Sequence, residues 1–141
     1  MNEIETISLS VVGEDSQQVY NIDFKVRTLL SREDKFIADQ KRREILGPNP
    51  GDALAMLQLE AFMIGQLWVR VVDPPEWWKA QGFGRSLKDG NVIAAIYNAA
   101  TDKENERKIA LKQKADDAMA ALSKMQTQVE PEPVPKAPQQ K

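Results

Sequence analysis

The chain contains no cysteine and no histidine among its 141 residues. These two absences exclude thiolate nucleophiles, disulfides, Cys/His zinc sites and imidazole as an acid–base group. Catalysis would have to rely on carboxylate, Lys, Tyr or Ser side chains, and no motif gathers such groups. We therefore expect a protein that binds other proteins and is not an enzyme, with no cofactor and no metal ion.

The chain also lacks a large excess of charge, since its net charge is −2 with acidic and basic residues mixed. A strongly basic surface is the electrostatic signature of nucleic-acid binding, so we expect no nucleic-acid partner. The N-terminus has no signal-peptide pattern, and the most apolar segment, residues 53–72, includes Glu60 and Arg70, which are costly in lipid. We expect a cytoplasmic protein with no membrane segment.

Two segments near the N-terminus alternate between apolar and polar residues, from Ile7 to Val11 and from Tyr20 to Val26. This period of two predicts half-buried strands, and the turn-rich residues 13–16 separate them. We expect a β-hairpin over Glu5 to Arg27, within a β-region of residues 1–28. A lone hairpin is barely stable, so it must pack on helices or pair with another chain.

A helix is predicted from Arg32 to Leu46, because Ser31 and Asp34 approximate a capping box and Gly47 follows the last helical residue. A second helix follows, for which Asn49 or Asp52 is the expected cap.

This second helix is apolar nearly all round, so we expect it to be central and buried. Gly65 would permit another backbone to approach it closely. Its end, residues 67–72, is rich in β-formers and is compatible with a strand, although we assign it to the helix.

Asp73 is the expected cap of a short helical turn that carries Trp77 and Trp78. A last core helix follows it and completes a helical core over residues 29–100. Its apolar stripe lies at helical spacing: Val92, Ile93, Ile96, Tyr97 and Ala100.

Residues 101–127 predict an amphipathic helical extension, because helix propensity is high and an Ala/Leu/Met stripe runs along it. The candidate partner-binding residues of this stripe are Leu111, Ala115, Met119 and Leu122. Two interpretations remain: a solvated helix stabilised by local pairs such as Glu104 with Lys108, or a helix that binds a partner, which we favour. The Pro-rich residues 128–141 predict a disordered tail. The expected fold class is thus mainly α with a small N-terminal β-hairpin (α+β).

Three side chains remain open to interpretation. Glu60 could be a catalytic acid of raised pKa, but we favour a structural pair with Arg43 or Arg70. Trp77 and Trp78 could stack a base or a sugar, fill the core, or form a protein-binding hot spot, and a core role or a protein interface is favoured.

The order of these motifs resembles the tail assembly chaperones of long-tailed bacteriophages, over about residues 20–100. The resemblance depends most on Pro74-Pro75-Glu76-Trp77-Trp78 and on Asp89-Gly90-Asn91-Val92 at a helix start. It implies a mostly helical protein of the bacterial host cytoplasm that binds the tape measure protein, recruits tail tube protein and is absent from the mature virion. It also implies that some such proteins have a longer form made by frameshifting.

Two other functions remain as alternatives. A virion structural protein of the neck, tail or capsid would use the hairpin for sheet augmentation and would persist in particles. A small enzyme is the second alternative, disfavoured by the missing His and Cys. Homo-oligomerisation is left open by the sequence.

Overall fold

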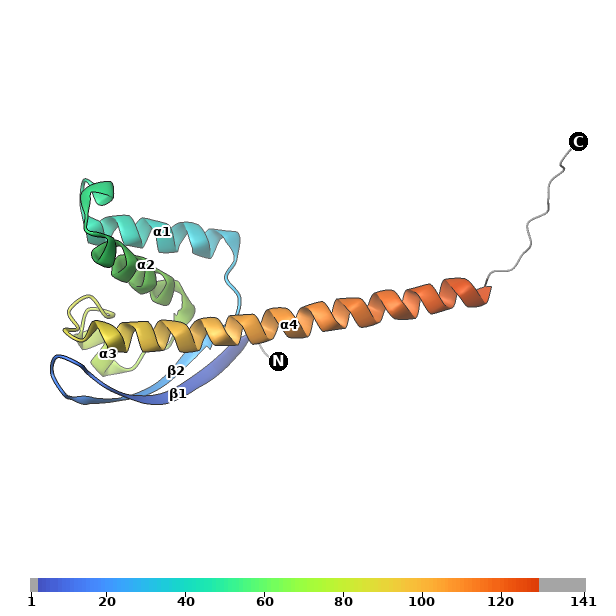
Figure 1. Cartoon of the computed structure of the whole chain (residues 1–141), viewed down its shortest axis with the longest axis horizontal. Helices are drawn as coiled ribbons and strands as arrows, with labels where there is room; N and C mark the ends of the chain where they lie inside the picture. Colours follow the sequence, from blue (N-terminus) through green and yellow to red (C-terminus); the bar gives the residue numbers. More distant parts are fainter. Residues whose placement is uncertain (1–2, 130–141) are drawn as a thin grey trace, which may run out of the picture. The chain divides into compact units, whose positions relative to one another are not determined.

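The structure, a computed structural model, describes residues 3–129 and has the expected α+β fold, with an N-terminal antiparallel sheet followed by helices (Figure 1). The chain divides into a compact unit over Met1–Arg107 and a second unit over Lys108–Lys141. Within the described residues, none of the helices combines the length and apolar character needed to cross a membrane.

The predicted hairpin is confirmed: β1 (Ile4–Val12) pairs antiparallel with β2 (Val19–Arg27). Every second residue of β2 is buried from Tyr20 to Val26, so one face of the sheet contributes to the core. A third strand, β3 (Val71–Val72), pairs with Lys25 and Val26 on the other side of β2. The assignment of residues 67–72 to a helix was therefore wrong for the last two, because Val71 takes an extended conformation to join the sheet.

Helix α1 (Arg32–Leu46) has the predicted bounds, and its capping box is present. The Ser31 hydroxyl accepts from the Asp34 N–H at 3.0 Å, and the Asp34 carboxylate accepts from the Ser31 N–H at 3.0 Å. The helix packs on α2 (Ala55–Arg70) at Gly65, where an added Cβ would lie 2.5 Å from the Ala38 carbonyl oxygen. The close approach expected at Gly65 is confirmed.

The predicted N-terminal caps of two later helices were wrong. Asn49 precedes a short 3-10 helix, η1 (Pro50–Asp52), of which Asp52 is the last residue, and α2 begins only after Leu54. Helix α3 (Glu76–Ala80) begins after Pro75, while Asp73 has a positive φ of 49°. Two prolines separate Asp73 from the first helical residue, so its side chain is out of position to cap that turn.

Helix α4 (Gly90–Val129) joins the predicted core helix and the predicted extension in one continuous helix. It ends at Val129, inside the segment 128–141 that was predicted to be a disordered tail. Residues 130–141 lie outside the described residues, and so does that prediction for them.

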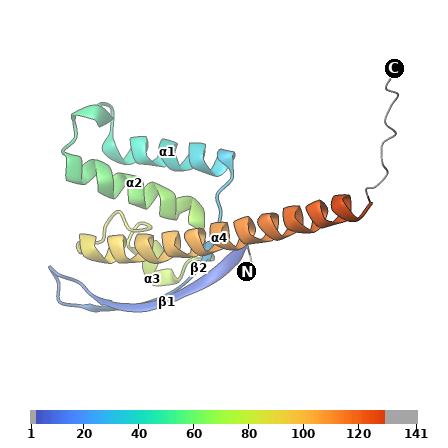
Figure 2. The same ribbon diagram turned by 45° about the vertical axis from the view of Figure 1, so that its right-hand side comes forward.

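In the compact unit, the first part of α4 lies between the sheet and the pair α1/α2 (Figures 1 and 2). The core joins the inner face of β1 and β2 to side chains of α2, α3 and α4. The predicted stripe of the last core helix is buried at Val92, Ile93, Ile96 and Ala100, and Tyr97 is half-buried. The apolar pattern of this segment therefore correctly predicted its place in the core.

Candidate protein-interaction surfaces

The helix-start motif at Asp89 and Asn91 holds the turn of the hairpin. Asp89 is fully buried, and its carboxylate accepts from the N–H groups of Asp15 and Ser16 at 2.8 and 2.9 Å. The Ser16 hydroxyl donates to the same carboxylate at 2.6 Å. A Cβ at Gly13 would lie 2.3 Å from the Asp89 carboxyl carbon, so the turn and the start of α4 approach as closely as a glycine allows.

Asn91 completes this connection from the first turn of α4. Its side-chain oxygen accepts from the Glu14 N–H at 3.0 Å, and its side-chain nitrogen donates to the Val12 carbonyl at 2.9 Å. Asp89 and Asn91 thus form hydrogen bonds with backbone groups of the hairpin turn, which would otherwise be exposed at the end of the hairpin. Sequence reasoning had identified the motif but had predicted no contact with the hairpin.

The hydrogen bonds to Asp89 determine its titration. The Ser16 hydroxyl and then the Ser16 N–H are the main causes that lower the pKa of Asp89 from 3.8 to about 2. Burial and the Asp89 carboxylate raise the pKa of Tyr20, whose hydroxyl donates to Asp89 at 2.9 Å. The lowered pKa keeps Asp89 ionised as an acceptor, and the raised pKa keeps Tyr20 protonated as a donor. The hydrogen bonds of this buried carboxylate are thereby preserved, and they stabilise the fold.

The structure separates the two candidate tryptophans. Trp78 is 1% exposed and packs edge-on against Phe24, with ring centroids 5.3 Å apart. Its side chain is a core residue, so of the interpretations for Trp78 the core role holds and a surface hot spot does not, because a partner cannot reach the ring in this fold.

Trp77 is half-buried and contacts Tyr20 and Phe24, each at a centroid distance of 5.7 Å. It lines a surface cavity of about 270 Å³ together with Gln81, Gln18 and residues 19–21 of β2. Trp77 therefore combines a packed face with an accessible one and remains a candidate contact for a partner.

The predicted ion pairs of Glu60 were wrong. Arg43 binds Asp39 at 2.9 Å, while the buried Arg70 binds Glu104 of α4 at 2.6 Å and donates to the Arg27 carbonyl at 3.0 Å. Glu60 is half-buried, and a Cβ at Gly90 would lie 2.6 Å from its Oε2 atom. Arg70 of α2 therefore contacts both β2 and α4, and it connects three segments that are far apart in the sequence.

The prediction that α2 is buried on all sides was also wrong, and it concealed a surface. Its second half is buried except at Gln66 and Trp68, whereas its first half and the preceding residue expose an apolar patch, which we call the α2 patch: Leu54, Met56, Leu57, Leu59 and Phe62. The exposed fractions range from 40% at Phe62 to 74% at Leu54. Exposed apolar patches often mark protein interfaces. The apolar residues on nearly all sides of α2 were the sequence signal for this patch. The sequence does not show, however, which sides of the helix are covered by neighbouring elements.

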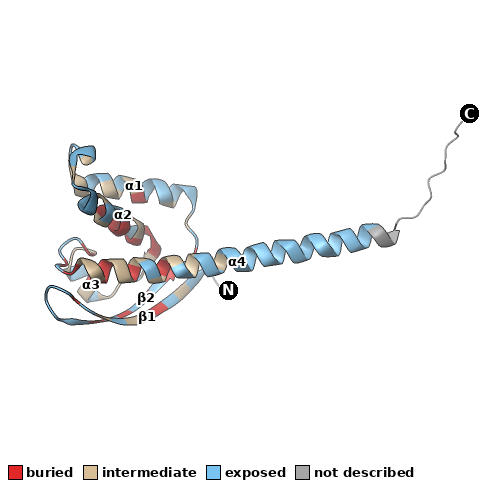
Figure 3. Cartoon of the chain, in the orientation of Figure 1, coloured by how far each residue is buried: buried red, intermediate tan, exposed pale blue. Residues whose placement is uncertain are grey.

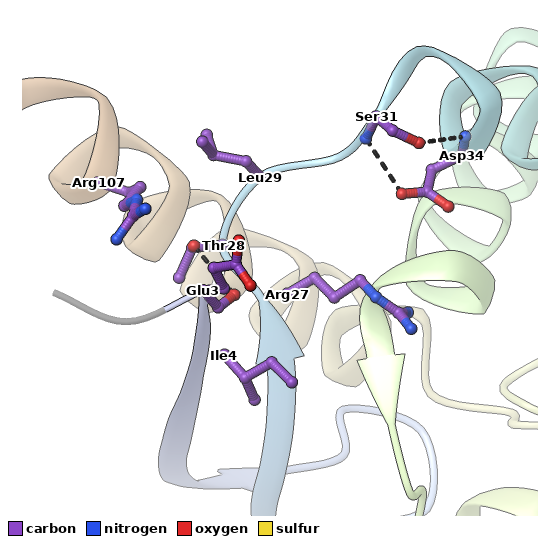
Figure 4. Close-up of a pocket in the computed structure, with 8 residues that line it drawn as sticks. All are labelled: Glu3, Ile4, Arg27, Thr28, Leu29, Ser31, Asp34 and Arg107. Atoms are coloured by element: carbon purple, nitrogen blue, oxygen red, sulfur yellow. Dashed lines mark hydrogen bonds between the residues drawn. The ribbon is translucent and has the colours of Figure 1, made fainter. Parts of the chain in front are cut away.

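A cavity of about 260 Å³ lies near the open end of the hairpin, which is opposite its turn. Residues of the sheet, α1 and α4 are among those that line it (Figure 4). Ser31 and Asp34 face each other there in the capping box, and the Thr28 hydroxyl donates to the Glu3 carbonyl at 3.1 Å. These polar groups are engaged in holding the fold together. Among residues 3–129, no cluster of three or more potential metal-binding side chains is present.

The C-terminal part of α4 has a different surface. All side chains from Lys108 to Gln126 are exposed, as the continuous pale blue of this segment shows (Figure 3). The four predicted partner-binding residues Leu111, Ala115, Met119 and Leu122 all belong to this exposed segment. Leu111 is 39% exposed, Leu122 48% and Met119 65%, so large apolar side chains are accessible along the helix.

Most of these apolar residues form one row. We call this row the seam, and its members are separated alternately by four and three residues: Leu111, Ala115, Ala118, Leu122 and Met125. This alternation is the pattern of core positions in coiled coils, where the helix packs along another helix. Met119 widens the seam on one side, while Ile109 lies on the opposite side of the helix.

Charges are distributed unequally around the seam. Lys112 and Lys114 occupy the positions that flank it, one on each side, whereas Asp116 and Asp117 lie further round the helix. Lys112 pairs with Asp116 at 3.2 Å, but both side chains are well exposed, so this pair is weak. A partner helix with acidic flanks would complement the seam, whereas two parallel copies would place Lys112 near Arg107 of the other copy.

Comparisons of the chain with family models, with curated proteins and with solved structures gave no match.

Proposed function

We propose that this protein is a tail assembly chaperone of a long-tailed bacteriophage, which binds the tape measure protein and recruits tail tube subunits without remaining in the virion. The observation that carries the proposal is the exposed seam from Leu111 to Met125 on α4. A holdase for a long helical protein needs an accessible apolar helix surface of this kind.

The chemistry of the seam indicates how it would bind. Its small residues Ala115 and Ala118 allow close approach of a second helix, and the larger Leu111 and Leu122 would pack on either side of them. Lys112 and Lys114 would favour acidic residues beside the apolar stripe of the partner. Several copies bound along one long partner would gain avidity from individually modest contacts.

The resemblance in the sequence supports the same proposal from another direction. Asp89 and Asn91, which carried part of it, fix the hairpin on the start of α4. The motif would thus preserve the fold of the compact unit, leaving partner binding to other surfaces, including the accessible face of Trp77.

A matched pair of variants tests the role of the seam. Leu111→Lys with Leu122→Lys should reduce co-purification of the tape measure protein at least about tenfold, because two charges would be buried in the contact. Ile109→Lys with Gln113→Lys adds the same two charges on the opposite side, at exposed residues of which Ile109 is 69% exposed, and should bind as the wild type does. Equal binding by both variants would remove the seam from the proposal.

A further inference from the structure

The outer strand of the sheet, β1, has one open edge. The strand order is β1-β2-β3, so β1 is paired on one side only (Figure 1). Natural proteins usually protect such an edge with charged residues, proline or a bulge, because it can pair with another strand. The exposed side chains along β1 are uncharged: Ile4, Thr6, Ser8, Ser10 and Val12.

The hydrogen bonds at the two ends of the hairpin show which backbone groups face the open edge. Thr28 N–H donates to the Glu3 carbonyl at 2.8 Å, and Gly13 N–H donates to the Gln18 carbonyl at 2.8 Å. Hydrogen-bonded and non-hydrogen-bonded pairs alternate in an antiparallel ladder. The odd-numbered residues of β1 therefore bond to β2, and the even-numbered residues direct their N–H and C=O groups outward.

Side-chain contacts across the ladder agree with this assignment. The Ser8 hydroxyl donates to Asp23 at 3.2 Å, and the Ser10 hydroxyl donates to Asn21 at 2.8 Å. Residues in non-hydrogen-bonded pairs have the closer side chains, as these contacts require. From Ile4 to Ser10, the outward amides thus form a regular row.

We propose that this edge binds β1 of a second copy of the chain, antiparallel and with Ser8 at the two-fold axis, so that two three-stranded sheets join into one. An antiparallel pair centred on Ser8 places Ile4 opposite Val12 and Thr6 opposite Ser10, so apolar residues meet apolar residues and hydroxyls meet hydroxyls. On the inner face, Ile7 meets Leu9 and the half-buried Glu5 meets Val11. The exposed face of the edge is thus chemically complementary to itself, and the register brings no like charges opposite each other.

The alternative symmetric register, centred on Ile7, would place the apolar Ile4 opposite the polar Ser10. At the far end of the strand, the Val12 carbonyl already accepts a bond from Asn91 at 2.9 Å, so the backbone contact centred on Ser8 involves mainly residues 6–10. This inference does not depend on the proposed function, since it uses a different surface from the seam.

The absence of cysteine from the chain permits a direct test. Ser8→Cys should form a disulfide-linked dimer under mild oxidation, because paired residues across a two-fold axis lie within disulfide range. The matched control is Lys25→Cys, exposed on the same face but in β2 where it pairs with both β1 and β3, which should stay monomeric on a non-reducing gel. Equal cross-linking of both variants would overturn the proposal.

Light scattering on the cysteine-free protein provides the second measurement. The wild type should have twice the monomer mass of 15.9 kDa, and Ser8→Lys should be monomeric with an unchanged circular dichroism spectrum. Asn21→Lys should remain dimeric. A monomeric wild type, a dimeric Ser8→Lys variant, or a dimer lost in Leu111→Lys with Leu122→Lys would each contradict β1 pairing.

Discussion

The hydroxyl of Tyr20 donates a hydrogen bond of 2.9 Å to Asp89, joining the inner face of β2 to the residue that precedes α4. The same carboxylate accepts three further hydrogen bonds, from Asp15 and Ser16 in the hairpin turn. One buried acid therefore connects the sheet, its turn and the long helix.

Asp89→Asn should destabilise the compact unit, because an amide offers one acceptor oxygen where the carboxylate offers two. We expect the midpoint of thermal unfolding to fall by at least about 5 °C. Amide exchange at Asp15 and Ser16 should accelerate. Asp23→Asn, which alters an exposed acid on the outer face, should change the midpoint little. An Asp89→Asn variant as stable as the wild type would refute the assigned role.

The lowered pKa of Asp89 also predicts how stability depends on pH. The pKa is about 2 in the folded chain and 3.8 as the reference value, so the unfolded chain binds a proton first on acidification. The contribution of Asp89 is therefore present above about pH 3.8 and is lost as the pH falls toward 2. Urea unfolding of the wild type and Asp89→Asn should show their stabilities converging over this interval; a constant difference would be the contrary result.

The two tryptophans should respond differently to truncation. Trp78→Ala removes a fully buried ring and should cost about 3–5 kcal/mol of unfolding free energy. Trp77→Ala removes a half-buried ring and should cost about 1–2 kcal/mol, leaving the fold intact. Denaturant titration distinguishes the two variants, and similar costs would contradict the packing described for them. If Trp77 contacts the partner, the folded Trp77→Ala variant should also bind more weakly.

The ion pair between Arg70 and Glu104 should contribute more than other pairs of the chain, because Arg70 is 2% exposed. Glu104→Ala leaves a buried cation without this carboxylate, and we expect a loss of about 3 kcal/mol. Glu106→Ala, which removes an exposed partner of Lys103 at 3.8 Å, should change stability by less than about 0.5 kcal/mol. The prediction fails if chemical denaturation gives equal values for the two variants.

Local sequence patterns predicted much of the fold. Alternation from Tyr20 to Val26 identified the hairpin, and Ser31, Asp34 and Gly47 identified the bounds of α1. In these segments the caps, turns and burial pattern lie within a few residues of one another, so sequence neighbours contain the relevant information.

Other features depended on residues distant in the sequence. Val71 is extended because it pairs with Val26, and Trp78 is buried because Phe24 lies beside it. Likewise, the role of Asp89 depends on Ser16, far away in the chain. Of the candidate site, the exposed stripe on α4 was predicted, whereas the α2 patch was missed because burial of an apolar helix depends on its neighbours.

Co-expression of the wild-type chain with the neighbouring phage tail proteins, followed by mass spectrometry of finished particles, tests the proposed function most directly. We expect the tape measure protein to co-purify with this chain and the chain to be absent from the particles. Stable presence of the chain in particles, without binding to the tape measure protein, would contradict the chaperone proposal and would favour a structural component of the virion.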